Sequence, residues 1–192
     1  MKIQEAIFRM DGLFSSNLIH RIIDYMNTED LKLLGTLGGK NTDIRNVKGF
    51  TVTPISNQND LTNQDMTKYI FFNFIKKELD IALLNYTLKF SFYSFAGINQ
   101  IDFLKYSENG KYEIHSDDGS RTTRRITIIV NLNNDYDGGD FIFFNPINKK
   151  DIIHREKLNK GTILIFPSNF LYPHSVEPIT KGNRYSLVSW AI

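Results

Sequence analysis

The sequence predicts a mainly β protein: a double-stranded β-helix (jelly roll) core flanked by N-terminal α-helices. Apolar residues in the first third repeat at helical spacing, whereas those from residue 88 onward alternate with a period of two. Turns rich in Gly, Asn and Asp separate about eight strand candidates. No linker or internal repeat divides the chain. We therefore expect a single domain over 1–192, with helical support and a long loop over 1–87 and the jelly-roll core over 88–192.

Two helices are expected before the core. The first has a serine available as N-cap at Ser15 or Ser16, and its apolar residues recur at helical spacing: Leu18, Ile19, Ile22, Ile23 and Met26. The second begins near Thr62-Asn63-Gln64-Asp65, which resembles a capping box, and ends near Leu84. One broad face of it is expected to carry Ile70, Phe71, Phe74, Ile75 and Leu79.

Residues 35–60 lie between these helices and are rich in Gly, Asn, Thr and Ser. They are predicted to form a long loop, and loops of this length in compact domains are usually functional or mobile. Two interpretations stay open: a lid that closes over a substrate, and a connector.

The predicted strands begin at Leu88, where Leu88, Phe90 and Phe92 alternate with polar neighbours as in a half-buried strand. Further strands are predicted at 100–106, 112–117, 125–133, 141–144, 162–166, 174–178 and 185–192. Turn signals stand at 109–110, 137–139, 160–161 and 181–183. Short strands with such spacing are typical of a jelly roll or barrel.

The composition excludes several classes of function. The net charge of +2 gives no reason to expect nucleic-acid binding, and there is no cysteine for a disulfide, a thiol nucleophile or a thiolate zinc site. Charged residues interrupt the N-terminal apolar residues, so we expect no signal peptide. No stretch approaches the ~20 apolar residues of a membrane span. We expect a cytoplasmic protein that does not bind membranes.

Three side chains in the second half could bind a metal. His115 and Asp117 are two residues apart in a predicted strand, so both project to one face, and His174 opens a later strand. Two imidazoles and a carboxylate with open positions are the ligands of non-haem Fe(II) oxygenases. Two alternatives remain at this point: a polar strand surface where His115 and Asp117 bind nothing, and a zinc site.

Arg184 follows a Gly-Asn turn and opens an aromatic strand that ends in Trp190. A buried arginine there would need a carboxylate, and none is close in sequence. A bound dicarboxylate could supply one through a bidentate pair, with Ser186 on the same side of the strand. The alternative is an exposed arginine at the start of a strand.

Several motifs occur together and in one order between about Gln100 and Ile192, and this stretch resembles the prolyl 4-hydroxylase-like branch of the 2-oxoglutarate- and Fe(II)-dependent oxygenases. The matching pieces are Tyr106…Gly110…Tyr112-Glu-Ile-His115-Ser-Asp117, Arg124-Arg-Ile-Thr127 through Asn133, Asp137-Gly-Gly-Asp-Phe141, Lys160-Gly161 to Phe166, and His174–Pro178 followed by Gly182-Asn-Arg184-Tyr-Ser186 and Trp190.

The resemblance implies that His115, Asp117 and His174 bind Fe(II), and that Arg184 binds the distal carboxylate of 2-oxoglutarate. It also implies that three further side chains hydrogen-bond to this co-substrate: Tyr106, Thr127 and Ser186.

Other positions follow from the same resemblance. Trp190 is expected to line the pocket, and Arg124 and Tyr112 fall where relatives meet their substrate. Asn131 is a departure, because relatives commonly carry a tyrosine there that faces the co-substrate. The pocket is therefore expected to be shaped or hydrated differently.

The resemblance further implies a dioxygenase that uses O2 and 2-oxoglutarate, with ascorbate as a possible additional cofactor, and that releases succinate and CO2 as it hydroxylates a C–H bond. A peptidyl proline in a peptide or protein is the expected substrate. A free amino acid, a small molecule or an alkylated nucleobase would share the same iron core. Outside this class of enzyme, a jelly-roll or cupin-like binding module without catalysis is the competing hypothesis. The lysines and arginines at 149–160 are predicted to form a solvated hairpin rather than a nucleic-acid site.

Overall fold

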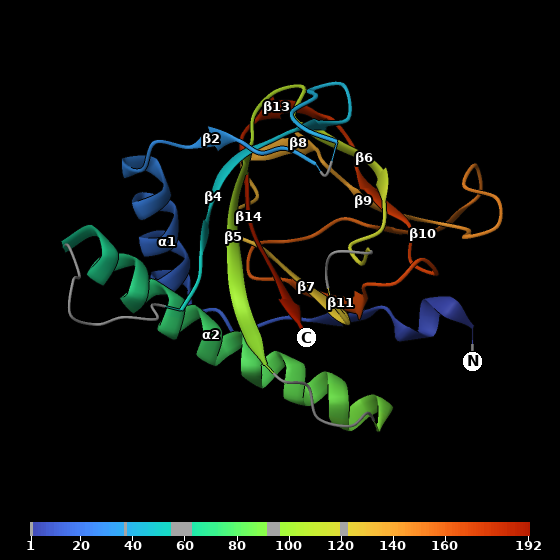
Figure 1. Ribbon diagram of the computed structural model, residues 1–192, viewed down its shortest axis with the longest axis horizontal. Coiled ribbons are helices and arrows are strands. Elements are labelled where there is room, and N and C mark those ends of the chain that lie inside the picture. The colour runs from blue at the N-terminus through green and yellow to red at the C-terminus, as the bar shows by residue number, and fades with distance from the viewer. Residues whose placement is uncertain (1, 37, 55–62, 92–96, 120–122) are drawn as a thin grey trace.

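The alternating apolar residues of the second half form two facing antiparallel sheets, shown in Figure 1. The computed structural model describes residues 2–36, 38–54, 63–91, 97–119 and 123–192. The larger sheet has the strand order β1 (Phe8–Met10), β11 (Ile163–Pro167), β7 (Ile126–Asn131), β14 (Arg184–Ala191), β5 (Ile98–Tyr106), β4 (Lys48–Val52) and β2 (Lys32–Leu33).

The smaller sheet has the strand order β10 (Ile152–Glu156), β9 (Phe141–Phe144), β12 (His174–Val176), β6 (Lys111–His115) and β3 (Arg45–Asn46). A two-stranded ribbon of β8 (Tyr136–Gly138) and β13 (Ile179–Gly182) adjoins it, and a 3-10 helix, Ile3–Ala6, precedes β1. Two antiparallel sheets packed face to face are the architecture of a jelly roll, so the predicted fold class is confirmed.

Two apolar clusters hold these layers together. One lies between the sheets and includes Leu104, Ile129, Phe141, Phe143 and Phe166. The other lies between the larger sheet and the helices, which cover its outer face in Figure 1. The functional residues described below lie between the sheets, on the side away from the helices.

Helix α1 (Ser16–Thr28) begins where its sequence predicts. The Ser15 hydroxyl accepts a hydrogen bond from the Leu18 backbone N–H at 3.2 Å, which caps the helix. Ile19, Ile22 and Met26 are buried against the sheet, as the helical spacing predicts.

Helix α2 (Asn63–Phe90) is longer than predicted, and the strand expected from Leu88 to Phe92 is wrong for residues 88–90. Tyr86 is fully buried and packs its ring on that of Phe90, four residues later, at 4.7 Å between centroids. This (i, i+4) contact extends the helical face by one more turn, and Ser91, with φ +52°, ends it. Phe92 and the predicted capping box at residues 62–65 lie outside the residues whose side chains are described.

The predicted buried face of α2 is wrong for two of its residues. Ile75 and Leu79 are buried, but Ile70 is 43% exposed and Phe74 is 56% exposed, and Phe72 is buried in their place. The helix therefore carries apolar side chains on two sides, and a single-face pattern could not separate them.

The segment 35–60 is only partly a loop. Residues 45–46 form β3, which pairs with β6, and residues 48–52 form β4, which pairs with β5. Gly49 permits this pairing, because a Cβ there would lie 2.1 Å from the Phe103 carbonyl oxygen. Residues 55–60 lie outside the described part of the chain.

Seven predicted strands agree within two residues with β5, β6, β7, β9, β11, β12 and β14. The short strands β1, β2, β3, β4, β8, β10 and β13 were not predicted, since two to five residues show little alternation. No helix in the described part of the chain is long and apolar enough to cross a membrane.

We expect Ile75→Ala to lower the free energy of unfolding by about 2–5 kcal/mol, because Ile75 is fully buried between α2 and the sheet. The matched control is Ile147→Ala, which removes the same atoms from a side chain that is 95% exposed and should change stability by less than about 0.5 kcal/mol. Urea denaturation followed by circular dichroism measures both values. Equal effects would contradict the placement of α2.

Candidate metal centre

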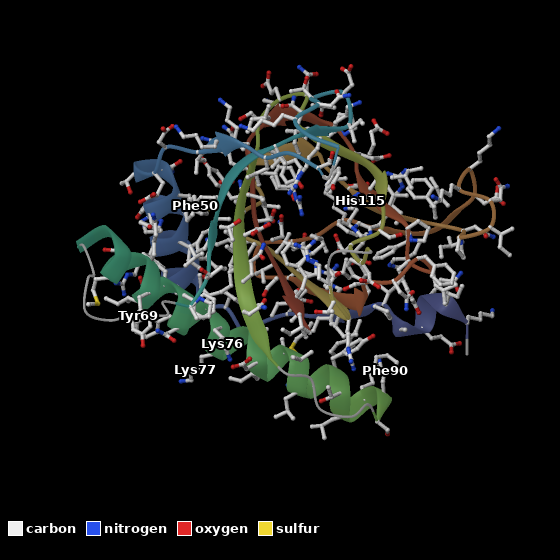
Figure 2. All side chains as sticks on the ribbon, in the orientation of Figure 1. Phe50, Tyr69, Lys76, Lys77, Phe90 and His115 are labelled. Carbon is white, nitrogen blue, oxygen red and sulfur yellow. The ribbon has the colours of Figure 1, made fainter. Side chains whose placement is uncertain are left out.

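The pairing of β6 with β12 places two histidines side by side. His115 is the last residue of β6 and His174 the first of β12, and they are direct partners in the antiparallel register. Asp117 lies two residues beyond the end of β6 and turns its carboxylate to both rings. Figure 2 shows His115 at the end of β6, on the opposite side of the molecule from α2.

The donor atoms of these three residues converge. His115 Nε2 is 3.6 Å from Asp117 Oδ1, and His174 Nε2 is 3.6 Å from Asp117 Oδ2. All three ligand atoms lie within 4.8 Å of one another. Ligands about 2.0–2.2 Å from one divalent ion, on adjacent positions, are roughly 3 Å apart, so a small closure would complete such a site.

Backbone carbonyls fix the orientation of both rings. His115 Nδ1 lies 2.8 Å from the Glu113 carbonyl oxygen, and His174 Nδ1 lies 3.0 Å from that of Tyr172. Because a carbonyl can only accept, each Nδ1 carries the proton and each Nε2 keeps its lone pair for a metal. The sequence alone could not identify these two acceptors.

The charges of the three residues also suit a cation. Burial, together with the nearby His115, lowers the pKa of His174 to about 4 despite the opposing effect of Asp117, so the ring is neutral at pH 7. Burial alone would raise the pKa of Asp117, but the two histidines and a hydrogen bond from Thr127 outweigh it and hold the pKa well below its usual range. A neutral His174 imidazole beside the ionised Asp117 carboxylate results.

Thr127, which the family resemblance assigned to the co-substrate, contacts a metal-site residue. Its hydroxyl donates to Asp117 Oδ2 at 2.7 Å and lies 2.8 Å from the Ser168 hydroxyl. Thr127 is on β7 and Ser168 follows β11, so the larger sheet holds the carboxylate in place across the interior.

Arg184 is the first residue of β14 and is only 1% exposed. Its Nε donates to Asn131 Oδ1 at 3.1 Å, and its Cζ lies 5.3 Å from the ring centre of Tyr106. Its Nη2 has no hydrogen-bond partner among the residues that the structure describes. The guanidinium also forms no ion pair with any of these residues. Burying an unpaired charge is costly, so an anion is expected to bind there.

Asn131, the departure from the family pattern, positions this arginine. Its amide nitrogen donates to the Asn133 and Leu158 carbonyl oxygens at 2.7 and 3.0 Å, and its oxygen accepts from Arg184 and from the Tyr136 hydroxyl. All of its polar atoms are thus satisfied inside the protein. Asn131 does not line the pocket.

One interior pocket joins the two groups. Its wall includes the three side chains of the candidate metal site and Arg184, together with five more of the predicted residues: Tyr106, Tyr112, Arg124, Ser186 and Trp190. Ser186 is 1% exposed, and its hydroxyl has no partner in the part of the chain that the structure describes. Burial raises the pKa of Tyr106, so its phenol stays protonated.

A second, outer cavity of about 470 Å³ meets this pocket at a shared rim. The rim consists of Arg45, Tyr112, His115, Asp117 and Arg124, which line both spaces. Residues of the segment predicted as a loop, Gly35, Thr36, Gly38 and Ile44, form the outer wall.

The two predicted substrate residues differ in their contacts. The Arg124 guanidinium lies over the Trp190 ring at 3.4 Å, and burial lowers the pKa of Arg124. Tyr112 stacks on His115 at 3.5 Å between centroids and packs under Arg45. Both therefore stand at the rim, beside the metal-site histidine.

Sequence reasoning missed two charged residues of the pocket. Arg45 comes from β3, within a segment without strand signal, and its Nη1 donates to the Gly35 carbonyl oxygen at 2.8 Å. Asp102 on β5 is 7% exposed and accepts hydrogen bonds from Thr51 and Gln100. A buried position in the strand Ile98–Tyr106 was the only signal for Asp102.

The arrangement fits a divalent transition metal with a bidentate organic acid beside it. Two imidazole nitrogens and one carboxylate leave coordination positions open. Arg184 Nη2 and Ser186 Oγ are unpaired polar atoms in the same pocket, and they match the needs of a second, distant carboxylate.

The comparisons with known proteins agree with this site. Residues 101–192 match the family model of the 2OG-Fe(II) oxygenase superfamily. A PKHD-type hydroxylase of Idiomarina loihiensis is 28% identical over 97 residues, which are 48% of this chain and 42% of that protein. A PKHD-type hydroxylase of Prochlorococcus marinus is 36% identical over 97 residues, which are 48% of this chain and 41% of that protein. The matched part thus spans about two fifths of the relatives' length.

Solved structures extend the likeness of fold to nearly the whole chain. A Pseudomonas putida prolyl-4-hydroxylase superposes with a TM-score of 0.71 at 18% identity, over 97% of this chain and 92% of that one. A prolyl hydroxylase of Trichoplax adhaerens, in complex with a peptide fragment of hypoxia inducible factor, has a TM-score of 0.74 at 16% identity, over 97% and 83%.

The sequence match covers the strands that carry the three converging ligands and the buried arginine. By this match, residues 101–192 are similar to the 2OG-Fe(II) oxygenase superfamily, and nearly the whole chain shares its fold with solved prolyl hydroxylases.

Proposed function

We propose that this chain is an Fe(II)- and 2-oxoglutarate-dependent dioxygenase that hydroxylates a C–H bond of a peptidyl proline. The observation that carries the proposal is the unpaired Nη2 of buried Arg184, next to the unpaired Ser186 hydroxyl, in one pocket with His115, Asp117 and His174. A metal site alone would not need this arginine.

When bound, Fe(II) and 2-oxoglutarate supply the oxidising chemistry: O2 is reduced, the keto acid becomes succinate and CO2, and one oxygen atom enters the substrate. The protein holds His115, Asp117 and His174 as ligands, with both imidazoles fixed by carbonyls. Arg184, oriented by Asn131, holds the far carboxylate of the co-substrate, and Ser186 donates to it. These contacts set the direction in which the keto acid enters the pocket.

A peptide substrate is supported by the outer cavity of about 470 Å³, which opens onto the metal site over a rim of Tyr112, Arg124 and Arg45. The Trichoplax relative was solved with a peptide fragment. Segment 35–44 would contact such a peptide from the outer wall. Within the basic stretch 149–160, Arg155 pairs with Glu177 and Asp140.

Anaerobic titration of the protein with Fe(II) and 2-oxoglutarate should give a weak visible charge-transfer band, and addition of O2 should then release succinate. His174→Ala should lower the affinity for the metal by at least about 100-fold, since it removes one of three ligands. His20→Ala is the matched control, because His20 lies on α1 with its side chain 75% exposed. Folded, metal-loaded protein that gives neither band nor succinate would show that the chain is a binding module or a different metalloprotein.

Arg184→Ala should raise the 2-oxoglutarate concentration for half-maximal succinate release by roughly 10- to 100-fold, since a hydrogen bond to a charged group contributes about 1.5–3 kcal/mol. Fe(II) affinity measured without 2-oxoglutarate should not change. Arg155→Ala, which removes an exposed guanidinium, is the control.

Asn131→Asp tests the same contact without creating a cavity. A carboxylate 3.1 Å from Arg184 Nε would neutralise the guanidinium inside the protein, so we expect the same direction of change as in Arg184→Ala. Unchanged 2-oxoglutarate dependence in both variants would remove the proposed role of Arg184.

The substrate class is tested by mass spectrometry for the gain of one oxygen atom. Proline-containing peptides should be modified, while matched peptides with alanine in place of proline, free proline and alkylated oligonucleotides should not. Oxidation of a free amino acid or a nucleobase, with peptides unmodified, would overturn the peptide assignment and leave the oxygenase assignment intact.

A further inference from the structure

Helix α2 has a second apolar face, which points away from the sheets. Its buried side chains, among them Phe72, Ile75 and Leu79, pack on the larger sheet. On the opposite side six apolar side chains are 37–71% exposed: Met66, Ile70, Phe74, Ile81, Leu84 and Leu88. In Figure 1 this helix runs along the edge of the molecule, and in the described part of the chain no helix or strand lies beyond it. Contiguous exposed apolar surface of this kind marks an interaction site.

The spacing of this face is that of a helix-pairing seam. Positions 70, 74, 77, 81, 84 and 88 alternate steps of four and three residues, as the core positions of a heptad repeat do. Five of these six positions are apolar, and Lys77 is the exception. From Ile70 to Leu88 the seam covers 18 residue steps, roughly 27 Å of helix.

We propose that α2 pairs antiparallel with α2 of a second copy of this chain, about a two-fold axis at the level of Leu79. Ile70 and Leu88 are each nine residues from Leu79, Phe74 and Leu84 are each five, and Lys77 and Ile81 are each two. One axis therefore places every seam residue opposite another seam residue of the second copy. Such self-complementarity is the property that a two-fold interface requires.

The shape of the surface matches the same register. Near the N-terminal half of α2 a groove of about 310 Å³ lies between the helices, lined by Leu18, Arg21, Ile70 and Phe74. At the other end of α2, Leu84 is 56% exposed and Leu88 is 71% exposed, the largest exposed fraction among the apolar side chains described on this helix. The two-fold axis brings Leu84 and Leu88 of each copy into the groove of the other. The dimer would therefore contain two equivalent contacts, each with exposed leucines seated in a groove.

The single charged seam residue favours the antiparallel direction. In a parallel pair Lys77 would face Lys77 of the second copy, and this like-charge contact is unfavourable. In the antiparallel pair Lys77 faces Ile81, and Asp80 of the second copy stands about one residue away along the axis. Figure 2 shows Lys77 on the outer side of α2, and within one copy Lys76 already pairs with Asp80 at 2.5 Å.

The chain has no cysteine, so introduced ones report the register without background. We expect an equimolar mixture of the variants Ile70→Cys and Leu88→Cys to form a disulfide-linked heterodimer under mild oxidation. Each variant alone should not cross-link, because equal positions of the two copies would be roughly 27 Å apart, well beyond the ~7 Å limit for a disulfide. Non-reducing electrophoresis and intact mass measure the product.

Light scattering of the full chain tests the association itself. The unmodified protein should have twice the monomer mass, and Phe74→Glu should have the monomer mass, with an unchanged helical circular dichroism spectrum. Ile147→Glu, the same kind of change on a distant side chain that is 95% exposed, should remain dimeric. A monomer mass for the unmodified protein at all concentrations would overturn the proposal.

Cross-linking of Ile70→Cys with itself would overturn the antiparallel register. If Phe74→Glu fails to fold, the cysteine variants, which keep the rest of the seam apolar, still decide the result.

Discussion

The Arg184 guanidinium is buried where β14 pairs with β5 and β7, and it forms no ion pair with any residue that the structure describes. A charge removed from water in this way needs a counter-charge, so the protein is most stable when an anion occupies the pocket. The neighbouring side chains suit this need: Asn131 accepts from Nε, the Tyr106 ring faces the positive charge, and the Ser186 hydroxyl remains available.

The two histidines of the candidate metal site lie on the smaller sheet, whereas Arg184 lies on the larger one. Their convergence comes from the register of β6 with β12, which sets His115 opposite His174, while Thr127 and Ser168 reach Asp117 from the larger sheet. The proposed metal ligation and the proposed acid binding would thus use opposite walls of one interior, and sheet packing rather than a mobile loop fixes the distance between the two groups.

The sequence was sufficient where a pattern is local. Period-two alternation predicted the long strands, and the Ser15 cap predicted the start of α1. The ordered motifs predicted nine of the side chains that gather in the pocket, whereas Thr127 and Asn131, also predicted, do not line it. It was insufficient where pairing is long-range: β3 and β4 consist of few residues and exist because β6 and β5 lie beside them. For the same reason Arg45 and Asp102 could not be assigned to the pocket. The predicted end of α2 was wrong because Leu88 and Phe90 also fit the alternation of a strand. The contact of Phe90 with Tyr86, four residues earlier, is made in the helix.

Gly139, in the turn between β8 and β9, has a consequence for how the site could be lost. A Cβ there would lie 2.5 Å from Ile179 Cδ1 and 3.3 Å from Arg184 Cδ, and its φ of +69° is already unfavourable for other residues. A Cβ at this position would press on the Arg184 side chain, and the three atoms nearest to it belong to Ile179, Arg184 and Tyr136, none of which is a candidate metal ligand. A change at this one turn would therefore disturb the proposed keto-acid site through Arg184 while leaving the backbone that carries the proposed metal site in place.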